Sequence, residues 1–165
     1  MEIRDATEAD LPAIRDLYNA LIPTTTVAWR DDLSTLEEQA RALADRRAAG
    51  YATLVAEEDG DVIGYTCTTA FRSDRFTGYG HTAELSVHVR GDHHGTGIGR
   101  QLVEALAERS RAHDIHVLVA AVDADNEGSI DFHRAVGFEE VARMPEVGRK
   151  LDRWLTLVLL QRTIG

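Results

Sequence analysis

Three glycines alternate with single residues between an alternating apolar segment and an amphipathic one. Gly95, Gly97 and Gly99 follow residues 83–89 and stand at the start of residues 98–107. Apolar side chains recur every second residue before the glycines, which predicts a strand, and at helical spacing after them, which predicts a helix. The first turn of a helix leaves backbone N–H groups without intrahelical partners, and glycine lets a ligand approach them closely. The sequence therefore predicts an anion site here, suited to a phosphate or a pyrophosphate.

Two common phosphate-binding loops do not fit this segment. A P-loop ends in Gly-Lys-Ser or Gly-Lys-Thr, which the chain lacks. The dinucleotide pattern G-x-G-x-x-G fails because its last position is Arg100 when counted from Gly95 and Leu102 when counted from Gly97. The glycines also follow several expected strands, rather than the first strand of a βαβ unit. A glycine-rich turn without a ligand remains the alternative.

Composition and charge exclude several classes of protein. The chain has 165 residues, and we expect a single domain over residues 1–165. Its formal net charge of −10 argues against a general nucleic-acid surface. No apolar run reaches the length of a membrane span, and the first residues lack the pattern of a signal peptide. The single cysteine, Cys67, excludes an internal disulfide and is typical of a reducing compartment, so we expect a cytoplasmic protein.

Hydropathy patterns and capping residues predict a mixed sheet. Capping boxes at residues 7–10 and 34–37 start two helices, and the second stops near Gly50. The expected order is β-α-α-β-β-β-α-β-α-β-β, with helices on both faces of the sheet. The expected strands are 2–5, 51–57, 62–71, 83–89, 115–122, 138–144 and 153–161, and the last helix is 126–136.

The glycine loop resembles the pyrophosphate loop of the GNAT superfamily of N-acetyltransferases, whose pattern is Arg/Gln-x-x-Gly-x-Gly/Ala. His94, Gly97 and Gly99 take its three specified positions, with histidine in place of arginine or glutamine. Residues 126–138 are similar to the superfamily pattern N-x-x-S-I-x-L-[YH]-x-x-x-G-F. The resemblance covers the whole chain and implies the GNAT fold, an α/β fold with a central, mixed, mostly antiparallel twisted sheet and helices on both faces.

Further segments are similar to the branch that acetylates phosphinothricin, methionine sulfone and methionine sulfoximine. The resemblance implies direct transfer from acetyl-CoA to the amine of a small amino acid, an activity of antibiotic and herbicide resistance, and a homodimer whose interface the apolar strand 153–161 would help bury. His88, where tyrosine is common, and Leu155 and Thr156, where His-Asp or Leu-Asp is often found, depart from the branch. The carrying segments are 3–11, 24–29, 46–51, 71–72, 83–89, 150 and 153–154.

The resemblance also implies which residues bind acetyl-CoA. Backbone N–H groups along one strand would polarise the thioester carbonyl, the glycine loop would hold the pyrophosphate, and the cap of the last helix would contact the pantetheine. The residues expected in these roles are Val87, His88 and Val89 on the strand, His94, Gly95, Thr96, Gly97, Ile98, Gly99 and Arg100 in the loop, and Asn126 and Ser129 at the cap.

Two residues are candidates for proton transfer. Glu84 shares a strand face with Ser86 and His88, and its carboxylate could accept the proton of the amine, directly or through water; a solvated strand carboxylate is the alternative. His133 takes the position at which the superfamily protonates the leaving thiolate; a histidine on the helix surface is the alternative. No Cys, Asp or Glu stands at a convincing metal-ligand spacing from the histidine pair 93–94, so we expect no metal.

The amine acceptor is less constrained. Arginine suits bidentate contact with a substrate carboxylate, and an acidic or oxidised side chain would need a second set of donors, for which Arg75, Lys150 and Arg153 are candidates. A polyamine, an aminoglycoside or a protein N-terminus is an alternative acceptor, and a non-catalytic acyl-CoA-binding module is an alternative of another class. The expected substrate contacts are Trp29, Phe71, Arg72, Arg75, Thr82 and Glu84.

Overall fold

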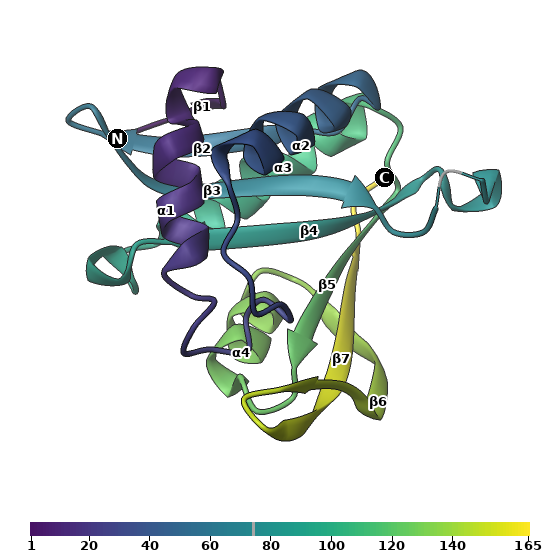
Figure 1. The fold of residues 1–165 in the computed structure, drawn as a ribbon. Helices are drawn as coiled ribbons and strands as arrows, with labels where there is room; N and C mark the ends of the chain where they lie inside the picture. Colours follow the sequence, from purple (N-terminus) through teal and green to yellow (C-terminus); the bar gives the residue numbers. More distant parts are fainter. Residues whose placement is uncertain (74) are drawn as a thin grey trace.

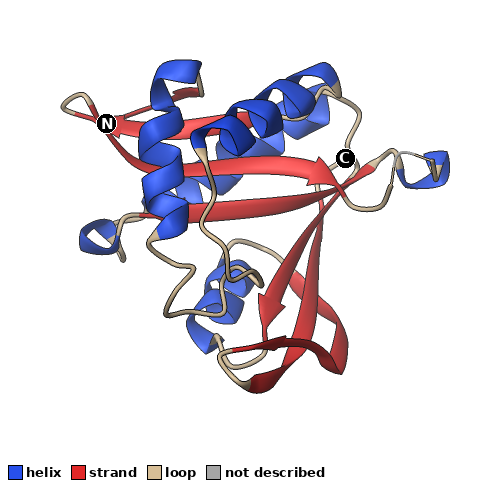
Figure 2. Cartoon of the chain, in the orientation of Figure 1, coloured by secondary structure: helices blue, strands red, loops and turns tan. Residues whose placement is uncertain are grey.

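A computed structural model of the chain describes residues 1–73 and 75–165. Its elements form a seven-stranded sheet in the order β1-β2-β3-β4-β5-β7-β6, with helices packed against it (Figure 1 and Figure 2). The order of the main helices and strands and the mostly antiparallel sheet are as the sequence predicts. The elements are β1 Glu2–Asp5, α1 Leu11–Asn19, α2 Leu36–Ala48, β2 Thr53–Glu58, β3 Asp61–Ala70, β4 Thr82–Val89, α3 Ile98–Ala112, β5 Val117–Asp123, α4 Glu127–Ala135, β6 Glu139–Lys150 and β7 Arg153–Thr163, with short 3-10 turns η1 Glu8–Asp10, η2 Thr77–Tyr79 and η3 Gly91–His93.

One helix start differs from its prediction by a residue. The expected capping box at residues 34–37 is wrong: Thr35 caps α2, accepting from the N–H of Glu38, whose carboxylate accepts from the N–H of Thr35. The hydroxyl of Ser34 instead accepts a hydrogen bond from the side-chain amide of Gln39 at 3.0 Å. The first box is confirmed, since Thr7 and Asp10 bond reciprocally at the start of η1.

The C-terminal hairpin is longer than predicted. Strand β6 was expected to end at residue 144, but it continues to Lys150, opposite Arg153 of β7. The register shifts between Met144 and Gly148, and this irregularity accommodates Pro145, which cannot donate to a sheet ladder. Strand β7 lies between β5 and β6, so β6 forms the edge of the sheet.

Helices cover both faces of the sheet. Helices α1 and α2 cross one face over β2, β3 and β4, while α3 lies behind the other (Figure 1). The main core lies on the α3 side and continues down to α4 and the end of β7; its fully buried members include Val103, Leu106, Leu118, Val158 and Leu160. No helix in the described ranges is long and apolar enough to cross a membrane.

Strands β4 and β5 are parallel neighbours over only three residues. Thr82, Ala83 and Glu84 pair with residues 117–119, and the pairing then ends. Beyond Glu84 the two strands diverge, so that β5, β7 and β6 swing away from the upper half of the sheet (Figure 1). The divergence opens the interior of the fold between the second half of β4 and α4.

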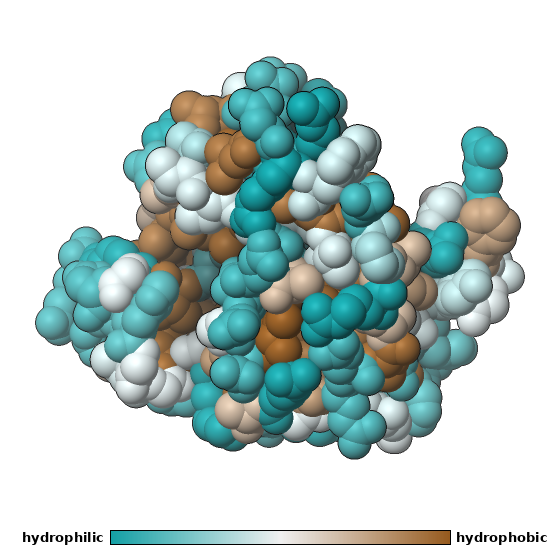
Figure 3. Space-filling model, turned by 90° about the horizontal axis from the view of Figure 1, so that it is seen from below, coloured by the Kyte–Doolittle hydropathy of each residue, from teal (hydrophilic) through white to brown (hydrophobic). Residues whose placement is uncertain are grey.

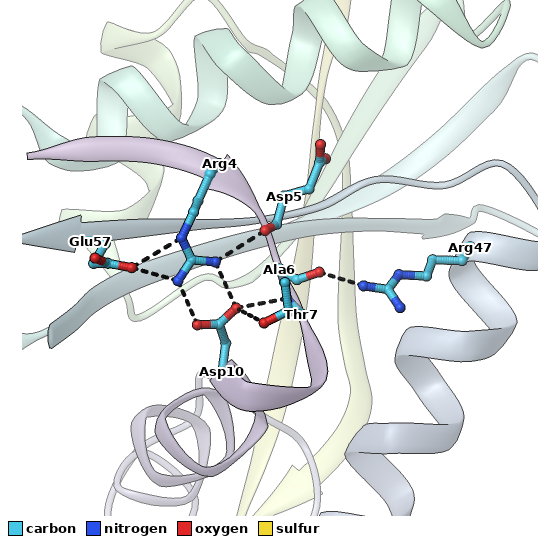
Figure 4. A network of polar contacts seen from close by, with 7 residues as sticks. All are labelled: Arg4, Asp5, Ala6, Thr7, Asp10, Arg47 and Glu57. Atoms are coloured by element: carbon cyan, nitrogen blue, oxygen red, sulfur yellow. Dashed lines mark hydrogen bonds and ion pairs between the residues drawn. The ribbon is translucent and has the colours of Figure 1, made fainter. Parts of the chain in front are cut away.

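A polar network anchors the first strand (Figure 4). The guanidinium of Arg4 donates to both carboxylate oxygens of Asp10 at 2.8 Å and to Glu57 of β2 at 2.5 Å. Hydrogen bonds from Arg4, and then from Thr7, lower the pKa of the buried Asp10 carboxyl to about 2. Arg47 of α2 donates to the carbonyl of Ala6 in the same network. The network thereby joins β1, β2, η1 and α2.

The loop between α1 and α2 is held against the C-terminal half of the sheet. The ammonium of Lys150 is buried and donates to the carbonyls of Ile22 at 2.7 Å and Ala28 at 2.6 Å. The hydroxyl of Thr26 donates to Asp123 at the end of β5 at 2.5 Å. The indole of Trp29 lies so close to Gly148 that a Cβ at that position would come within 2.3 Å of it. These contacts fix residues 20–35 beside the gap between β4 and β5.

Candidate active site

A cleft of about 760 Å³ occupies the gap between β4 and α4. Its walls come from the second half of β4, the loop before α3, the first turn of α3, and α4. The lining residues are Val87, Val89, His93, His94, Gly95, Gly97, Ile98, Gly99, Arg100, Asn126, Gly128, Ser129, Phe132, His133, Ala135 and Val136. Most of the residues predicted to bind a phosphorylated cofactor therefore line one cavity.

The glycine loop presents a row of free backbone donors to this cleft. Among the described residues, no hydrogen-bond acceptor pairs with the N–H groups of residues 95–100. Gly95 and Gly97 have φ values of +77° and +88°, and no atom lies within 4 Å of where their Cβ atoms would be. Both glycines thus hold a backbone conformation that other residues rarely adopt, beside open space. The positive end of the α3 dipole points toward the same loop, so the cleft is suited to an anion.

Gly99 has a different reason to be glycine. A Cβ at Gly99 would come within 3.1 Å of the Phe132 ring on α4. The missing side chain therefore lets the start of α3 pack closely against α4. Arg100 also joins α3 to α4, because its guanidinium donates to the carbonyl of Ala135 at 2.7 Å. Gly99 thus serves helix packing as well as access to the backbone.

Strand β4 turns alternate backbone groups into the gap. The N–H of Arg90 bonds to the carbonyl of Ile63 on β3, which places the backbone groups of Arg90 and, by alternation, His88 on the β3 side. The backbone groups of Val87 and Val89 consequently face the gap, where β5 has left. The carbonyl of Val89 confirms this direction, because the ring of His94 bonds to it at 2.9 Å.

His133 lies on the wall formed by α4. The ring is buried between Phe132 and Phe138, with centroids 5.1 and 5.4 Å away. Its Nδ1 lies 2.7 Å from the carbonyl of Ser129, which can only accept, so Nδ1 carries the proton and Nε2 is left as an acceptor. Burial lowers the pKa of His133 below its usual value, so the neutral ring predominates near pH 7. Asn126 caps α4 by accepting from the N–H of Ser129 at 3.1 Å.

Glu84 stands at the last paired residue of β4, where the strands begin to diverge. Its carboxyl is half-buried, and it makes no hydrogen bond or ion pair with any described residue. Burial without a compensating partner raises its pKa above the usual value. The side chain is therefore a free carboxylate in a partly desolvated position, which is the environment that makes a carboxylate more basic.

The side chains of three residues predicted to contact the cofactor point away from the cleft or are partly engaged by the protein. The side chain of His88 points away from the cleft and lines a cavity on the opposite face of the sheet, because side chains alternate along a strand. The hydroxyl of Thr96 turns back to the carbonyl of His93 at 2.7 Å, so Thr96 can offer the cleft only its N–H. His94 lines the cleft, but its bond to Val89 occupies one ring nitrogen.

The predicted substrate residues do not form one cluster. Phe71, Arg72 and Arg75 belong to the segment between β3 and β4, which projects from the body of the molecule near η2 (Figure 1). The guanidinium of Arg72 lies 5.8 Å from the rings of Phe71 and Tyr79 and is exposed to solvent. Because β3 ends at Ala70, opposite Ala83 of β4, Phe71 and Arg72 begin close to Glu84 along the sheet.

Thr82 and Trp29 belong to different parts of the fold. Thr82 is half-buried at the start of β4, two residues before Glu84. Trp29 packs on Gly148, donates to the carbonyl of Thr26 at 3.0 Å and leaves 37% of its surface exposed. These contacts hold the loop after α1 in place.

Two of the three candidates for a second donor set are already engaged. Lys150 is 4% exposed and gives its protons to backbone carbonyls of the loop after α1, so the prediction that it contacts a substrate is wrong. Arg153 is ion-paired with Asp125 and Asp123 near the end of β5. Arg75 remains exposed on the projecting segment. Of the three candidates, only Arg75 therefore has no side-chain hydrogen bond or ion pair to a described residue.

The sequence did not point to some residues of the cleft wall on α4, nor to those around the side chain of His88. Phe132, Ala135 and Val136 complete the cleft on the α4 side, and they recur at the helical spacing of a face directed inward, which was a readable signal. Tyr18, Arg46 and Tyr65 surround the side chain of His88 on the other face of the sheet. Their meeting depends on the packing of α1 and α2 on β3, which no local pattern reveals.

Comparison with known proteins agrees with this geometry. Residues 14–138 match the model of the acetyltransferase (GNAT) family. The chain is 43% identical over 160 residues to an L-methionine sulfoximine/L-methionine sulfone acetyltransferase of Pseudomonas aeruginosa, covering 96% of this chain and 92% of that protein.

Two solved structures superpose closely. A ribosomal-protein-alanine N-acetyltransferase from Brucella melitensis is 42% identical, with a TM-score of 0.94 over 99% of both chains. A phosphinothricin acetyltransferase from Sinorhizobium meliloti in complex with acetyl-CoA is 32% identical, with a TM-score of 0.93 over 99% of this chain and 88% of that one. The matched family and these likenesses lead to one conclusion: the chain belongs to the GNAT family and is an N-acetyltransferase.

Proposed function

We propose that the cleft binds acetyl-CoA and that the enzyme transfers its acetyl group directly to the α-amine of a small amino acid with an acidic or oxidised side chain. The observation that carries the cofactor is the row of free N–H groups at residues 95–100 beside two glycines that leave their Cβ positions open. These donors fit the pyrophosphate of coenzyme A, and the edge of β4 at Val87 and Val89 fits its extended pantetheine arm.

The first prediction concerns cofactor binding. Gly97→Glu places a side chain and a negative charge in the open space where the pyrophosphate would sit, so we expect calorimetry to show no measurable affinity for acetyl-CoA. Gly60→Glu is the matched control, because Gly60 has a similar φ of +87° and no atom near its Cβ position, but it lies in the β2–β3 turn. Wild-type affinity in Gly97→Glu would remove the loop from the proposed site.

The proposed acceptor follows from the relatives and from the chemistry around Glu84. The P. aeruginosa and S. meliloti proteins are named for acceptors with oxidised or phosphinic side chains. Glu84 offers a free carboxylate to an ammonium group, and Arg72 follows the strand that pairs with it. The B. melitensis structure, named for a ribosomal-protein alanine, favours a protein N-terminus as the second candidate acceptor.

The chain's residues divide the chemistry between the two sides of β4. The thioester of acetyl-CoA supplies an already activated acyl group, so the proposed transfer requires no metal ion. The N–H groups of Val87 and Val89 face the gap and can stabilise negative charge on a carbonyl oxygen there. Glu84 takes the proton of the amine, directly or through water, and its raised pKa makes it a stronger base.

His133 has a smaller part in this proposal. Nδ1 of His133 donates to the carbonyl of Ser129, so Nε2 is an acceptor. Because burial lowers the pKa of the ring, little of the imidazolium form is present at neutral pH to act as an acid. A thiolate leaves tolerably well without protonation, because the pKa of a free thiol is about 8.5. We therefore assign His133 mainly to holding the acyl end of the cofactor.

The second prediction tests the base. Glu84→Gln should lower kcat by roughly 10²- to 10⁴-fold, because the amide cannot accept the proton. Since burial raises the Glu84 pKa, the wild-type rate should rise with pH through a value above the ordinary one for glutamate, and this acid limb should vanish in the variant. His133→Phe should cost less, and Glu108→Gln, at an exposed residue of α3, should cost nothing. A wild-type pH–rate profile in Glu84→Gln refutes the assignment.

The third prediction tests the acceptor. In a thiol-release assay with a panel of amines, we expect turnover of phosphinothricin, methionine sulfoximine or methionine sulfone, and much poorer turnover of decarboxylated analogues. Arg72→Ala should lower kcat/KM by about 10²-fold, because the proposed contact with the substrate carboxylate is lost. Turnover of spermidine, an aminoglycoside or a peptide N-terminus, with none of the three amino acids accepted, contradicts the acceptor but not the transferase. A protein that binds acetyl-CoA and acetylates nothing would be a binding module.

We also propose that the enzyme is a cytoplasmic homodimer with no nucleic-acid partner. The dimer is supported by the β6–β7 hairpin rather than by β7 itself, which lies inside the sheet. Apolar patches lie among polar residues on the side of the molecule that carries this hairpin (Figure 3). Its exposed apolar side chains are Val141, Met144, Val147, Leu151 and Trp154, which are between 44% and 61% exposed.

The fourth prediction concerns this assembly. Light scattering at micromolar concentration should give twice the chain mass of 18.2 kDa. Val141→Glu or Trp154→Glu should shift the mass toward the monomer, because a charge replaces apolar surface at the edge strand or its hairpin. Leu36→Glu, at another exposed apolar residue, in α2, should leave the dimer intact. A single species of 18.2 kDa for the wild type argues against the dimer.

A further inference from the structure

A second cavity lies on the other face of β4 from the cofactor cleft. It has a volume of about 230 Å³ and is bounded by α1, α2, β3, β4 and the loop that joins α1 to α2. Val87 and Val89 line the cofactor cleft, while the intervening Ser86 and His88 line this cavity, so one strand separates the two spaces. The residues that shape it most are Tyr18, Arg46, Tyr65, Cys67, Ser86 and His88.

Arg46 brings an uncompensated positive charge to this cavity. Its Nε atom is buried and has no hydrogen-bond partner, and its guanidinium forms no ion pair with any described residue. The other two charged residues of the lining, Arg30 and Glu38, lie 3.5 Å apart and offset each other. A partly buried donor without a partner is costly unless a ligand satisfies it. The electrostatics of the cavity therefore favour an anion or a group with exposed oxygen atoms.

The remaining walls of the cavity are neutral. The rings of Tyr18 and Tyr65 pack on His88 with centroids 5.9 and 4.9 Å away. Burial lowers the pKa of His88 to about 4 and raises those of Tyr65 and Cys67, so none of the three is charged near pH 7. Ser86 is exposed, and its hydroxyl makes no hydrogen bond to a described residue. Arg46 and Ser86 are thus two free donors in the lining of the same cavity.

The cavity also stands in register with the proposed base. Glu84, Ser86 and His88 share one face of β4, at intervals of two residues. Arg72 lies beyond Glu84 in the opposite direction along the sheet. An amino acid with its amine at Glu84 could therefore direct its carboxylate toward Arg72 and its side chain toward this cavity. Lys150 and Arg153 cannot serve that side chain, because their donors are already engaged.

We propose that this cavity is the subsite for the oxidised or acidic side chain of the acceptor, whose oxygen atoms bind Arg46 and Ser86. The inference rests on the proposed amino-acid N-acetyltransferase activity and adds a specificity-determining residue, Arg46, to it. The aromatic rings of Tyr18 and Tyr65 then enclose the apolar stem of the same side chain.

The test compares two acceptors that differ only in two oxygen atoms, methionine sulfone and methionine. In Arg46→Gln, the ratio of kcat/KM for the sulfone to that for methionine should fall by about 10- to 100-fold, as expected for the loss of a charge-assisted hydrogen bond. Arg41→Gln is the matched control, because Arg41 lies on the same helix but is exposed and ion-paired with Glu37. Its ratio should equal that of the wild type, and all three proteins should bind acetyl-CoA equally in calorimetry.

A second variant tests the space rather than the charge. Ala42 lies one helical turn before Arg46 and lines the same cavity, so Ala42→Leu should fill it and reduce kcat/KM for the sulfone while glycine is acetylated as before. Denaturation curves show whether each variant is folded. An unchanged sulfone-to-methionine ratio in folded Arg46→Gln overturns the subsite and leaves the acetyltransferase standing.

Failure of the acceptor class has its own signature. If the wild type acetylates neither amino acid, calorimetry of methionine sulfone against the protein saturated with coenzyme A decides the subsite directly. Binding that is lost in Arg46→Gln and kept in Arg41→Gln supports the cavity as a subsite for the sulfone oxygen atoms, although the acceptor would be wrong. No binding of the sulfone to the wild type overturns it.

Discussion

The short parallel pairing of β4 with β5 determines what this fold can do. A strand inside a sheet forms backbone hydrogen bonds with neighbours on both sides, and β4 does so only as far as Glu84. Past that residue β3 still holds one side, while Val87 and Val89 are left with backbone groups facing the gap. An extended ligand can pair with such an edge as a strand would. The cofactor cleft is therefore the consequence of a sheet that stops being continuous halfway along one strand.

Because side chains alternate along β4, the cofactor cleft and the second cavity lie on opposite faces of this one strand. Valines face the cleft beside α3 and α4, and polar residues face the cavity beneath α1 and α2. Glu84 stands where both sides become accessible, because the strands part at that residue. Two ligands can thus approach the same backbone segment from opposite faces without sharing side chains. This arrangement suits direct transfer between them, which requires alignment rather than a covalent enzyme intermediate.

Much of the fold could be predicted because its signals are local. The strand, glycine and helix signature around residues 83–107 and the Asn126 cap arise from neighbours in the chain, and the structure places their residues in one cleft. The register of residues 34–38 could not be settled locally, because Thr35 caps the helix while Ser34 is drawn to Gln39. The face of His88, the engagement of Lys150 and the free charge of Arg46 all depend on contacts between distant segments.

The burial of Lys150 has a chemical consequence for a protein that handles acetyl thioesters. Of the 18 lysines and arginines in the chain, Lys150 is the single lysine. Lys150 is 4% exposed, and its ammonium donates to two backbone carbonyls. The other 17 residues of this set are arginines, whose guanidinium groups acyl thioesters do not modify readily. The surface therefore carries no lysine amine that could react with the acyl donor by chance. Lysine side chains of the enzyme therefore do not compete with the amine that it is meant to modify.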